Sequence, residues 1–170
     1  TDYAGIGTPY WLLLLSQSCR SQGYKVGILD ILAEGISRKD AVERIKTLNP
    51  RLISVCVYGE NVNSGTTQMS GAVKLANLIK ESGIDIPISF VGSHVQALPY
   101  KVLNEEPNID IIFTNEGVYS LWNILKLNDF TDIKQLETIN GITYIGLPII
   151  NYIKVKIYDN NENEIKTETI

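Results

Sequence analysis

Along the first 145 residues, segments whose apolar positions have helical spacing alternate with short, continuous apolar runs. Apolar positions at helical spacing predict five helices, at residues 9–22, 37–48, 67–82, 97–105 and 118–127. Short apolar runs rich in β-branched residues predict four strands between them, at residues 24–29, 52–58, 88–91 and 110–113. Strands that alternate with helices across short connections favour a parallel sheet with helices on both faces. We therefore expect an α/β fold, Rossmann-like and more specifically flavodoxin-like.

Several helix ends carry capping signals. Ser37 and Asp40 form a capping-box pattern at the second helix, and Gly23 is placed to end the first. Thr8 followed by Pro9 predicts that the Thr8 hydroxyl caps the first helix, with Pro9 as its first residue.

The pattern changes after residue 128. Residues 130–137 form a polar connector with some helical character, and residues 142–145 a short strand. Residues 152–158 alternate, and Asn160–Asn161 can turn them back into residues 164–170, which predicts a β-hairpin. This hairpin is expected to be an appendage to the wound core.

We accordingly divide the chain into a core at residues 1–145 and an extension or link to a following domain at residues 146–170. Wound α/β folds normally start with a strand, whereas the first element predicted here is a helix. The expectation is that a central strand precedes Thr1 and that the chain is a fragment of a larger protein.

Composition excludes several partners. The chain has 170 residues, 44% of them hydrophobic, and a formal net charge of −4, which leaves no electrostatic footprint for nucleic acid or an anionic membrane. Its longest apolar run, residues 10–15, is too short to span a bilayer, and no secretory signal is visible. Cys19 and Cys56 lack metal-site spacing. We expect a cytoplasmic protein that binds neither nucleic acid nor membrane.

Familiar catalytic motifs are missing. Gly5-Ile6-Gly7 matches only part of the Gly-x-Gly-x-x-Gly loop that binds dinucleotides, and it precedes Pro9. There is no Walker loop and no Gly-x-Ser-x-Gly elbow. With one histidine, His94, and two isolated cysteines, a zinc site made by this chain alone is not indicated. Catalysis by this segment alone is therefore not predicted.

The predicted strand ends instead gather polar and glycine residues at one edge of the sheet. The candidate contacts are Gly5, Thr8, Tyr58, Gly59, Asn61, Gly92, Ser93, His94, Glu116, Gly117 and Tyr119. Such a rim suits a large cofactor that bears many amide groups, because ligands of open α/β sheets bind at this edge. The alternative is ordinary turn chemistry, in which Tyr58 belongs to the core, Glu116 caps a helix and His94 faces solvent.

Four stretches, in this order, resemble the cobalamin-binding domain of cobalamin-dependent radical S-adenosylmethionine enzymes. The first is residues 23–55, which contain Gly-Tyr-Lys-Val-Gly-Ile-Leu-Asp and Leu-Asn-Pro-Arg-Leu-Ile-Ser-Val. The second is residues 91–99, at the place where the family commonly has Gly-Gly-Pro-His-x-x-x-x-Pro. The other two are residues 115–121, which resemble the family's Gly-Glu-Gly-Glu-x-x-Leu segment, and residues 141–144, which resemble its Gly-Ile-x-Tyr. The resemblance covers roughly residues 5–145.

Departures from related patterns refine what the resemblance implies. Gly92 and Ala97 stand where an Asp-x-His-x-x-Gly motif around His94 would need Asp and Gly, so the likeness is to the subgroup that binds cobalamin with its base displaced and without a protein histidine ligand. Ser93 replaces the family's second glycine, which tightens the slot for the nucleotide tail, and Gly92 is expected to lie against that tail. The radical domain's Cys-x-x-x-Cys-x-x-Cys motif is absent.

The resemblance thus implies a cofactor-binding module, not itself catalytic, that holds the corrinoid and presents it to a downstream radical domain, most often for methyl transfer. The iron–sulfur cluster and S-adenosylmethionine would belong only to that downstream domain. Two alternatives stay open: a flavodoxin- or receiver-like signalling domain, and a small enzyme or other small-ligand-binding α/β domain. Asp30 is the one strand-end aspartate available to a receiver, which needs several.

Overall fold

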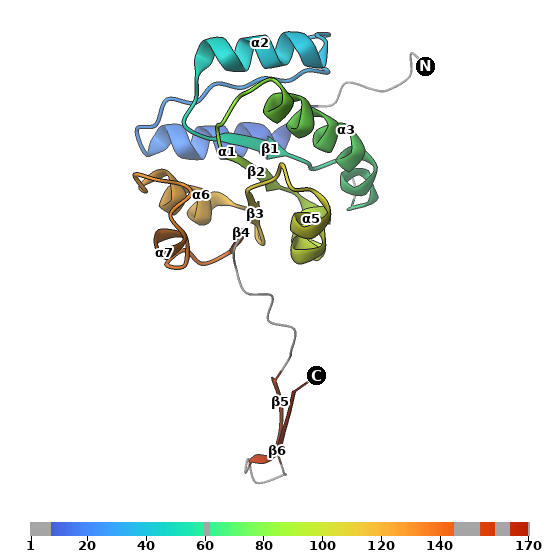
Figure 1. Cartoon of the computed structure of the whole chain (residues 1–170), viewed down its shortest axis with the longest axis vertical. Coiled ribbons are helices and arrows are strands. Elements are labelled where there is room, and N and C mark those ends of the chain that lie inside the picture. Colours follow the sequence, from blue (N-terminus) through green and yellow to red (C-terminus); the bar gives the residue numbers. More distant parts are fainter. Residues whose placement is uncertain (1–7, 60–61, 145–153, 159–163, 170) are drawn as a thin grey trace.

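The computed structural model describes residues 8–59, 62–144, 154–158 and 164–169. The helices are α1 (Tyr10–Ser21), α2 (Arg38–Leu48), α3 (Val62–Glu81), α4 (Ser93–Ala97), α5 (Pro99–Glu105), α6 (Val118–Leu125) and α7 (Ile133–Leu136). The strands are β1 (Ile53–Cys56), β2 (Ile88–Val91), β3 (Ile111–Phe113), β4 (Ile142–Tyr144), β5 (Lys154–Tyr158) and β6 (Glu164–Thr169). Figure 1 shows their arrangement.

A four-stranded sheet forms the centre of the fold, in the order β1-β2-β3-β4. β1, β2 and β3 are parallel, with Ile53 opposite Ile88 and Ser89 opposite Ile111. The crossovers through α3, and through α4 and α5, make this direction possible. β4 returns antiparallel to β3. The predicted α/β, flavodoxin-like fold is confirmed.

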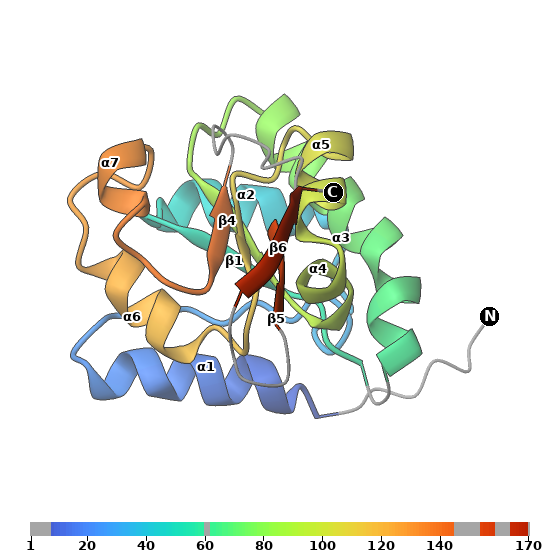
Figure 2. The same ribbon diagram turned by 90° about the horizontal axis from the view of Figure 1, so that it is seen from below.

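The sheet separates two hydrophobic clusters, because successive side chains of a strand point to opposite faces. The first cluster includes Phe90 of β2 and packs under α2, α3 and α5. The second includes Val91 and packs under α1, α6 and α7. Figure 2 shows α1 and α6 on one side of the sheet and α3, α4 and α5 on the other. With both faces covered, β2 and β3 are buried throughout, as their continuous apolar runs require.

The strand predicted at residues 24–29 is wrong as stated, since these residues pair with no strand in the described chain. Their packing is nevertheless two-sided. Tyr24 and Val26 lie against the second cluster and Leu29 against the first. The segment therefore has the side-chain environment of a strand but lacks a backbone partner.

The capping signals were partly right. The Ser37–Asp40 capping box is present at α2, and Gly23 follows α1 with a left-handed φ of 86°. The prediction for the start of α1 is wrong: Pro9 is the N-cap, no side chain caps the helix, and Tyr10 is its first residue. The backbone carbonyl of Thr8, not its hydroxyl, accepts a bond from the Tyr10 N–H, at 2.8 Å.

Two helices differ from their predicted bounds. α3 begins at Val62 instead of residue 67, so the helix starts earlier than predicted. In place of the single helix predicted at residues 97–105 there are two helices, and the first of them, α4, already begins at Ser93. The break falls at Leu98 because a residue that precedes a proline is disfavoured in the helical region, and Pro99 follows.

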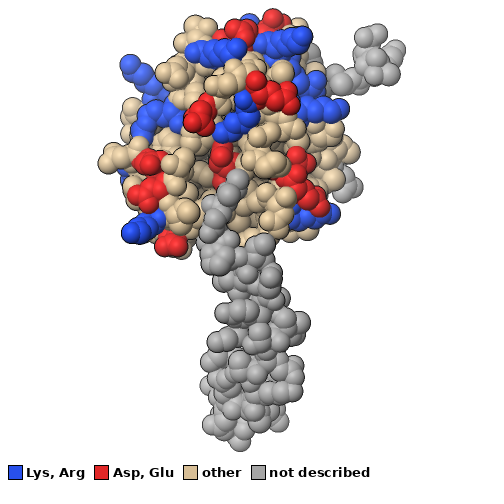
Figure 3. Space-filling model, viewed as in Figure 1, with Lys and Arg blue, Asp and Glu red and all other residues tan. Residues whose placement is uncertain are grey.

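The C-terminal hairpin is confirmed for the described residues, with β5 antiparallel to β6. The turn predicted at Asn160–Asn161 lies outside them, and the domain division at residue 145 stays a prediction. No helix in the described ranges has the length and apolar character needed to cross a membrane. Figure 3 shows acidic and basic side chains interspersed on one face, without a patch of a single sign.

Candidate functional site at the strand ends

Three loops meet beyond the carboxyl ends of β1, β2 and β3, and Gln96 joins them. Gln96 lies on α4, directly after β2. Its Nε2 donates to the hydroxyl of Tyr58, which follows β1, and to the carbonyl of Asn115, which follows β3, both at 2.6 Å. One side-chain amide therefore connects the ends of all three parallel strands.

An aromatic stack extends this cluster to α1. The rings of Trp11 and Tyr58 lie 4.7 Å apart between centroids, with an interplanar angle of 24°. Burial raises the pKa of the Tyr58 hydroxyl, and the nearby negative charge of Glu116 contributes in the same direction. Tyr58 is thus a neutral phenol at physiological pH, held by a ring on one side and an amide on the other.

The loop after β3 is built around Asn115. Its Oδ1 accepts the Gly117 N–H at 2.8 Å, and its Nδ2 donates to the hydroxyl of Ser120 at 3.2 Å. Gly117 is the N-cap of α6 with a φ of 82°, a left-handed conformation that favours glycine. The alternative role of Glu116 as a helix cap is wrong, because no side chain caps α6. The Glu116 carboxylate is exposed beside Tyr58.

Gly92 was expected to lie against the nucleotide tail of the cofactor, but the structure places it against the backbone of Val57. A Cβ on Gly92 would lie 2.2 Å from the carbonyl oxygen of Val57, so a side chain there would run into the backbone just after β1 and not into a ligand. Gly59 is similar, since its Cβ would lie 2.0 Å from the Cβ of Ser64. Both glycines permit close packing at the strand ends, and any contact they make with a ligand is through the backbone.

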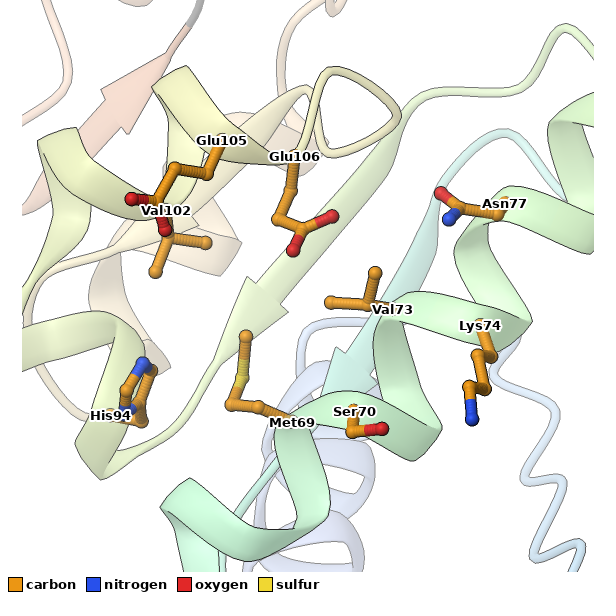
Figure 4. Close-up of a pocket in the computed structure, with 9 residues that line it drawn as sticks. All are labelled: Met69, Ser70, Val73, Lys74, Asn77, His94, Val102, Glu105 and Glu106. Atoms are coloured by element: carbon orange, nitrogen blue, oxygen red, sulfur yellow. The ribbon is translucent and has the colours of Figure 1, made fainter.

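His94 faces away from the Gln96 cluster. Ser93 and His94 lie on α4 and not in a loop, so His94 and Gln96 point to different sides of this helix. The Nδ1 of His94 lies 3.1 Å from the Thr66 hydroxyl oxygen. His94 also lines a groove of about 470 Å³ between α3 and α5, with Met69 and Glu105 among the other lining residues (Figure 4).

The remaining predicted residues are less informative. Thr8 is exposed at the start of α1. Tyr119 is 72% exposed, and its ring meets that of Trp122 edge-on at 5.2 Å. Gly5 and Asn61 lie outside the described residues.

A sequence profile of the B12 binding domain matches residues 1–124. The chain belongs to the B12-binding domain family. This match confirms the resemblance to a cobalamin-binding domain. No solved structure matches the chain.

Two curated relatives also match this B12-binding domain. One is an uncharacterized methyltransferase of Pyrococcus horikoshii, 25% identical over 138 residues, which cover 81% of this chain and 28% of the relative. The other is an anaerobic magnesium-protoporphyrin IX monomethyl ester cyclase of Rubrivivax gelatinosus, 26% identical over 145 residues, which cover 84% of this chain and 25% of the relative. The chain thus spans about a quarter of the length of either relative.

The donors and acceptors at the strand ends fit the amide groups at the edge of a corrinoid. Within the described residues, the Tyr58 hydroxyl proton, the Gln96 carbonyl and the Glu116 carboxylate have no hydrogen-bond partner. A carboxamide both donates and accepts hydrogen bonds, so this mixed set complements it. No group of three or more metal-ligating side chains lies together in the described ranges.

The prediction from sequence missed Gln96 and Trp11 as members of the site. In the sequence Gln96 lies just before the helix predicted at residues 97–105, and its role depends on α4 starting directly after Gly92. Trp11 was assigned to a helix with no reason to meet Tyr58, 47 positions further along the chain. Neither relationship has a local sequence signal.

Proposed function

We propose that this chain is the cobalamin-binding module of a larger radical S-adenosylmethionine enzyme, a methyltransferase. The observation that carries the proposal is the Gln96 cluster, a polar, aromatic-backed rim at the ligand-binding edge of a B12-binding domain. In such a module the protein supplies binding and orientation while the cofactor supplies the chemistry, here the carriage of a methyl group on cobalt.

The parent activity is proposed from the relatives and from the resemblance described above. One relative is named as a methyltransferase and the other as a cyclase that acts on a methyl ester. Both are far longer than this chain. We place the iron–sulfur cluster and S-adenosylmethionine in a domain that follows residue 170, and the hairpin of β5 and β6 between the two.

Each residue of the rim has a role in this proposal. The Tyr58 hydroxyl and the Gln96 carbonyl bind corrin amides, Glu116 accepts from a further amide, and Trp11 fixes the Tyr58 ring. The backbones of Gly59, Gly92 and Gly117 allow the cofactor to approach the strand ends closely. Thr8, Ser93 and Tyr119, with Gly5 and Asn61, complete the proposed contact set.

We further propose that cobalamin binds with its own base displaced and without a protein histidine on cobalt. His94 is the one histidine in the chain. Its bond with Thr66 and its place in the groove between α3 and α5 direct it away from Tyr58 and Gln96. This geometry supports a binding mode in which no imidazole of this chain would coordinate the lower face of cobalt.

Titration with hydroxocobalamin, followed by absorbance, tests the proposal. We expect a Kd below about 100 μM, a binding free energy stronger than about −5.5 kcal/mol. The bound spectrum should be that of the base-displaced form without nitrogen ligation from a protein imidazole. A titration without binding at this concentration contradicts the proposal, whereas binding with a histidine-ligated spectrum contradicts only its base-displaced part.

The receiver-like alternative has no structural observation in its favour. Asp30 is occupied locally, because its Oδ1 accepts the backbone N–H groups of Leu32 and Ala33. A receiver needs several carboxylates at one strand edge, and no such cluster lies within the described residues.

A further inference from the structure

The groove between α3 and α5 is a cavity apart from the Gln96 cluster, since neither Gln96 nor Tyr58 lines it. Its volume of about 470 Å³ is in the range of small-molecule sites. α3 presents one face to it, with Met69, Val73 and Asn77 spaced four residues apart. The groove is therefore formed by side chains that helices hold in place.

The floor of the groove is apolar. Met69 and Val102 are only 8% and 4% exposed and belong to the first hydrophobic cluster, and Val73 packs against that cluster. Figure 4 shows these three side chains pointing toward the space between the helices. A methionine thioether adapts its shape to a neighbour and makes favourable contacts with aromatic rings. The floor thus suits the hydrocarbon part of a ligand, a ring in particular.

Two carboxylates stand above this floor, on Glu105 at the end of α5 and on Glu106 directly after it. Figure 4 shows the half-buried Glu106 carboxylate turned toward Met69. Among the described residues, no ion pair or hydrogen bond of this carboxylate is found. Glu105 has Lys101 at 3.9 Å, but the two side chains are 61% and 60% exposed, so this pair holds the carboxylate weakly.

The other polar groups of the groove do not neutralise these carboxylates. Lys74 is directed away from both of them in Figure 4, and no ion pair joins it to either within the described chain. Asn77 is engaged elsewhere, because its Oδ1 accepts from Asn108 at 2.9 Å. The groove therefore combines an apolar floor with uncompensated negative charge.

We propose that this groove binds a small organic cation, a primary ammonium attached to an aromatic or short aliphatic body. The ammonium pairs with Glu106 and Glu105, and the body covers the floor around Met69 and Val102. Hydrogen bonds between an ammonium and a carboxylate are stronger than neutral ones, so the carboxylates select for the charge. The floor selects for the apolar body. This site goes beyond the cofactor-binding role proposed above and does not depend on it.

Three probes of nearly the same shape separate charge from apolar contact: 2-phenylethylammonium, 2-phenylethanol and phenylacetate. Each is titrated into the ¹⁵N-labelled chain, and the backbone amide resonances are followed by NMR. We expect the ammonium to shift the amides of α3 and α5 with a Kd of about 1 mM, as for a ligand of about nine non-hydrogen atoms. The alcohol should bind at least about tenfold more weakly, and the anion should bind more weakly still. Equal binding of the ammonium and the alcohol overturns the proposal.

Glutamine variants locate the charge that the probe recognises. Glu106→Gln and Glu105→Gln should each weaken binding of 2-phenylethylammonium by about fivefold, and the double variant by about tenfold or more. Neither should change the binding of 2-phenylethanol. Lys74→Met is the matched control within the groove and should leave the Kd of the ammonium unchanged or lower it, because it removes a like charge.

Glu116→Gln tests the competing location at the strand ends, where a carboxylate also lies near the aromatic ring of Tyr58. It should leave the Kd of 2-phenylethylammonium unchanged. A melting curve of every variant confirms folding, and Glu105→Gln, at an exposed position, decides the matter if Glu106→Gln does not fold. If Glu116→Gln weakens binding while Glu105→Gln does not, the cation binds at the rim and the proposal is wrong.

Discussion

Gln96 donates its side-chain amide to the hydroxyl of Tyr58 at 2.6 Å, across the ends of β1 and β2. The same nitrogen donates to the Asn115 carbonyl beyond β3. Three loops that have no covalent connection at this edge are thereby held in one arrangement. Since residues on separate loops bind a ligand well only when their spacing is fixed, Gln96 is expected to affect both stability and cofactor affinity.

Gln96→Met is predicted to destabilise the fold by about 1–3 kcal/mol, because two hydrogen bonds are lost while the volume is kept. Tyr58→Phe removes one of the two bonds and keeps the stack on Trp11, so it should cost less, about 0.5–1.5 kcal/mol. Urea unfolding of both variants measures the difference. Equal losses would show that the bond to Asn115 contributes nothing.

Gly92→Ala is predicted to destabilise the protein by about 1–3 kcal/mol, since its Cβ would meet the Val57 backbone and the strand ends must move apart. Gly71→Ala is the matched control. Gly71 lies within α3, and the nearest atom to its added Cβ is the end of the Arg38 side chain at 3.5 Å. This control should stabilise by about 0.5–1 kcal/mol, as alanine does in a helix. Thermal melting of the two variants should therefore shift in opposite directions.

The order and type of most elements could be predicted because each depends on local pattern. Period-2 burial places Phe90 and Val91 on opposite faces, and the Ser37–Asp40 capping box starts α2. The strand at residues 24–29 could not be judged in this way. Its side chains satisfy the pattern of a strand, but a strand is defined by a backbone partner, and that is a long-range property.

The site was predictable as an edge but not as a set of contacts. The fold rule places Tyr58, Ser93 and Glu116 near the same end of the sheet. It does not say whether a glycine such as Gly92 faces a ligand or a neighbouring strand, because that depends on distances of a few tenths of an ångström. For the same reason the two sides of α4, with His94 on one and Gln96 on the other, emerged only from the structure.

Stability is predicted to fall between pH 9 and pH 11 through Cys56. Burial raises the pKa of its thiol from 9.0 to about 11, because the thiolate is poorly solvated in the fold. Because the pKa of the Cys56 thiol is higher in the folded than in the unfolded chain, the free energy of unfolding has its full value below pH 9. It decreases as the pH rises through 11. The loss should approach about 2–3 kcal/mol. Urea unfolding across this range checks it, and Cys56→Ala should show a shallower decline than the parent.

His94→Ala is predicted to leave cobalamin binding nearly unchanged, within about threefold in Kd. The His94 imidazole is paired with Thr66 and lines the groove between α3 and α5, so its loss removes no group from the rim around Tyr58. The spectrum of the bound cofactor should also match that of the parent. Titrations with hydroxocobalamin, each with a melting curve to confirm folding, provide both readings.

Two further variants make the outcome for His94 decisive. Thr66→Val removes the partner of His94 on the groove side and should likewise leave Kd within about threefold. Gln96→Met should weaken binding by about tenfold or more, since it disturbs the rim itself. If His94→Ala weakens binding as much as Gln96→Met, His94 turns toward the cofactor on binding. A nitrogen-ligated spectrum that disappears in His94→Ala would go further, because it would make His94 the lower ligand of cobalt.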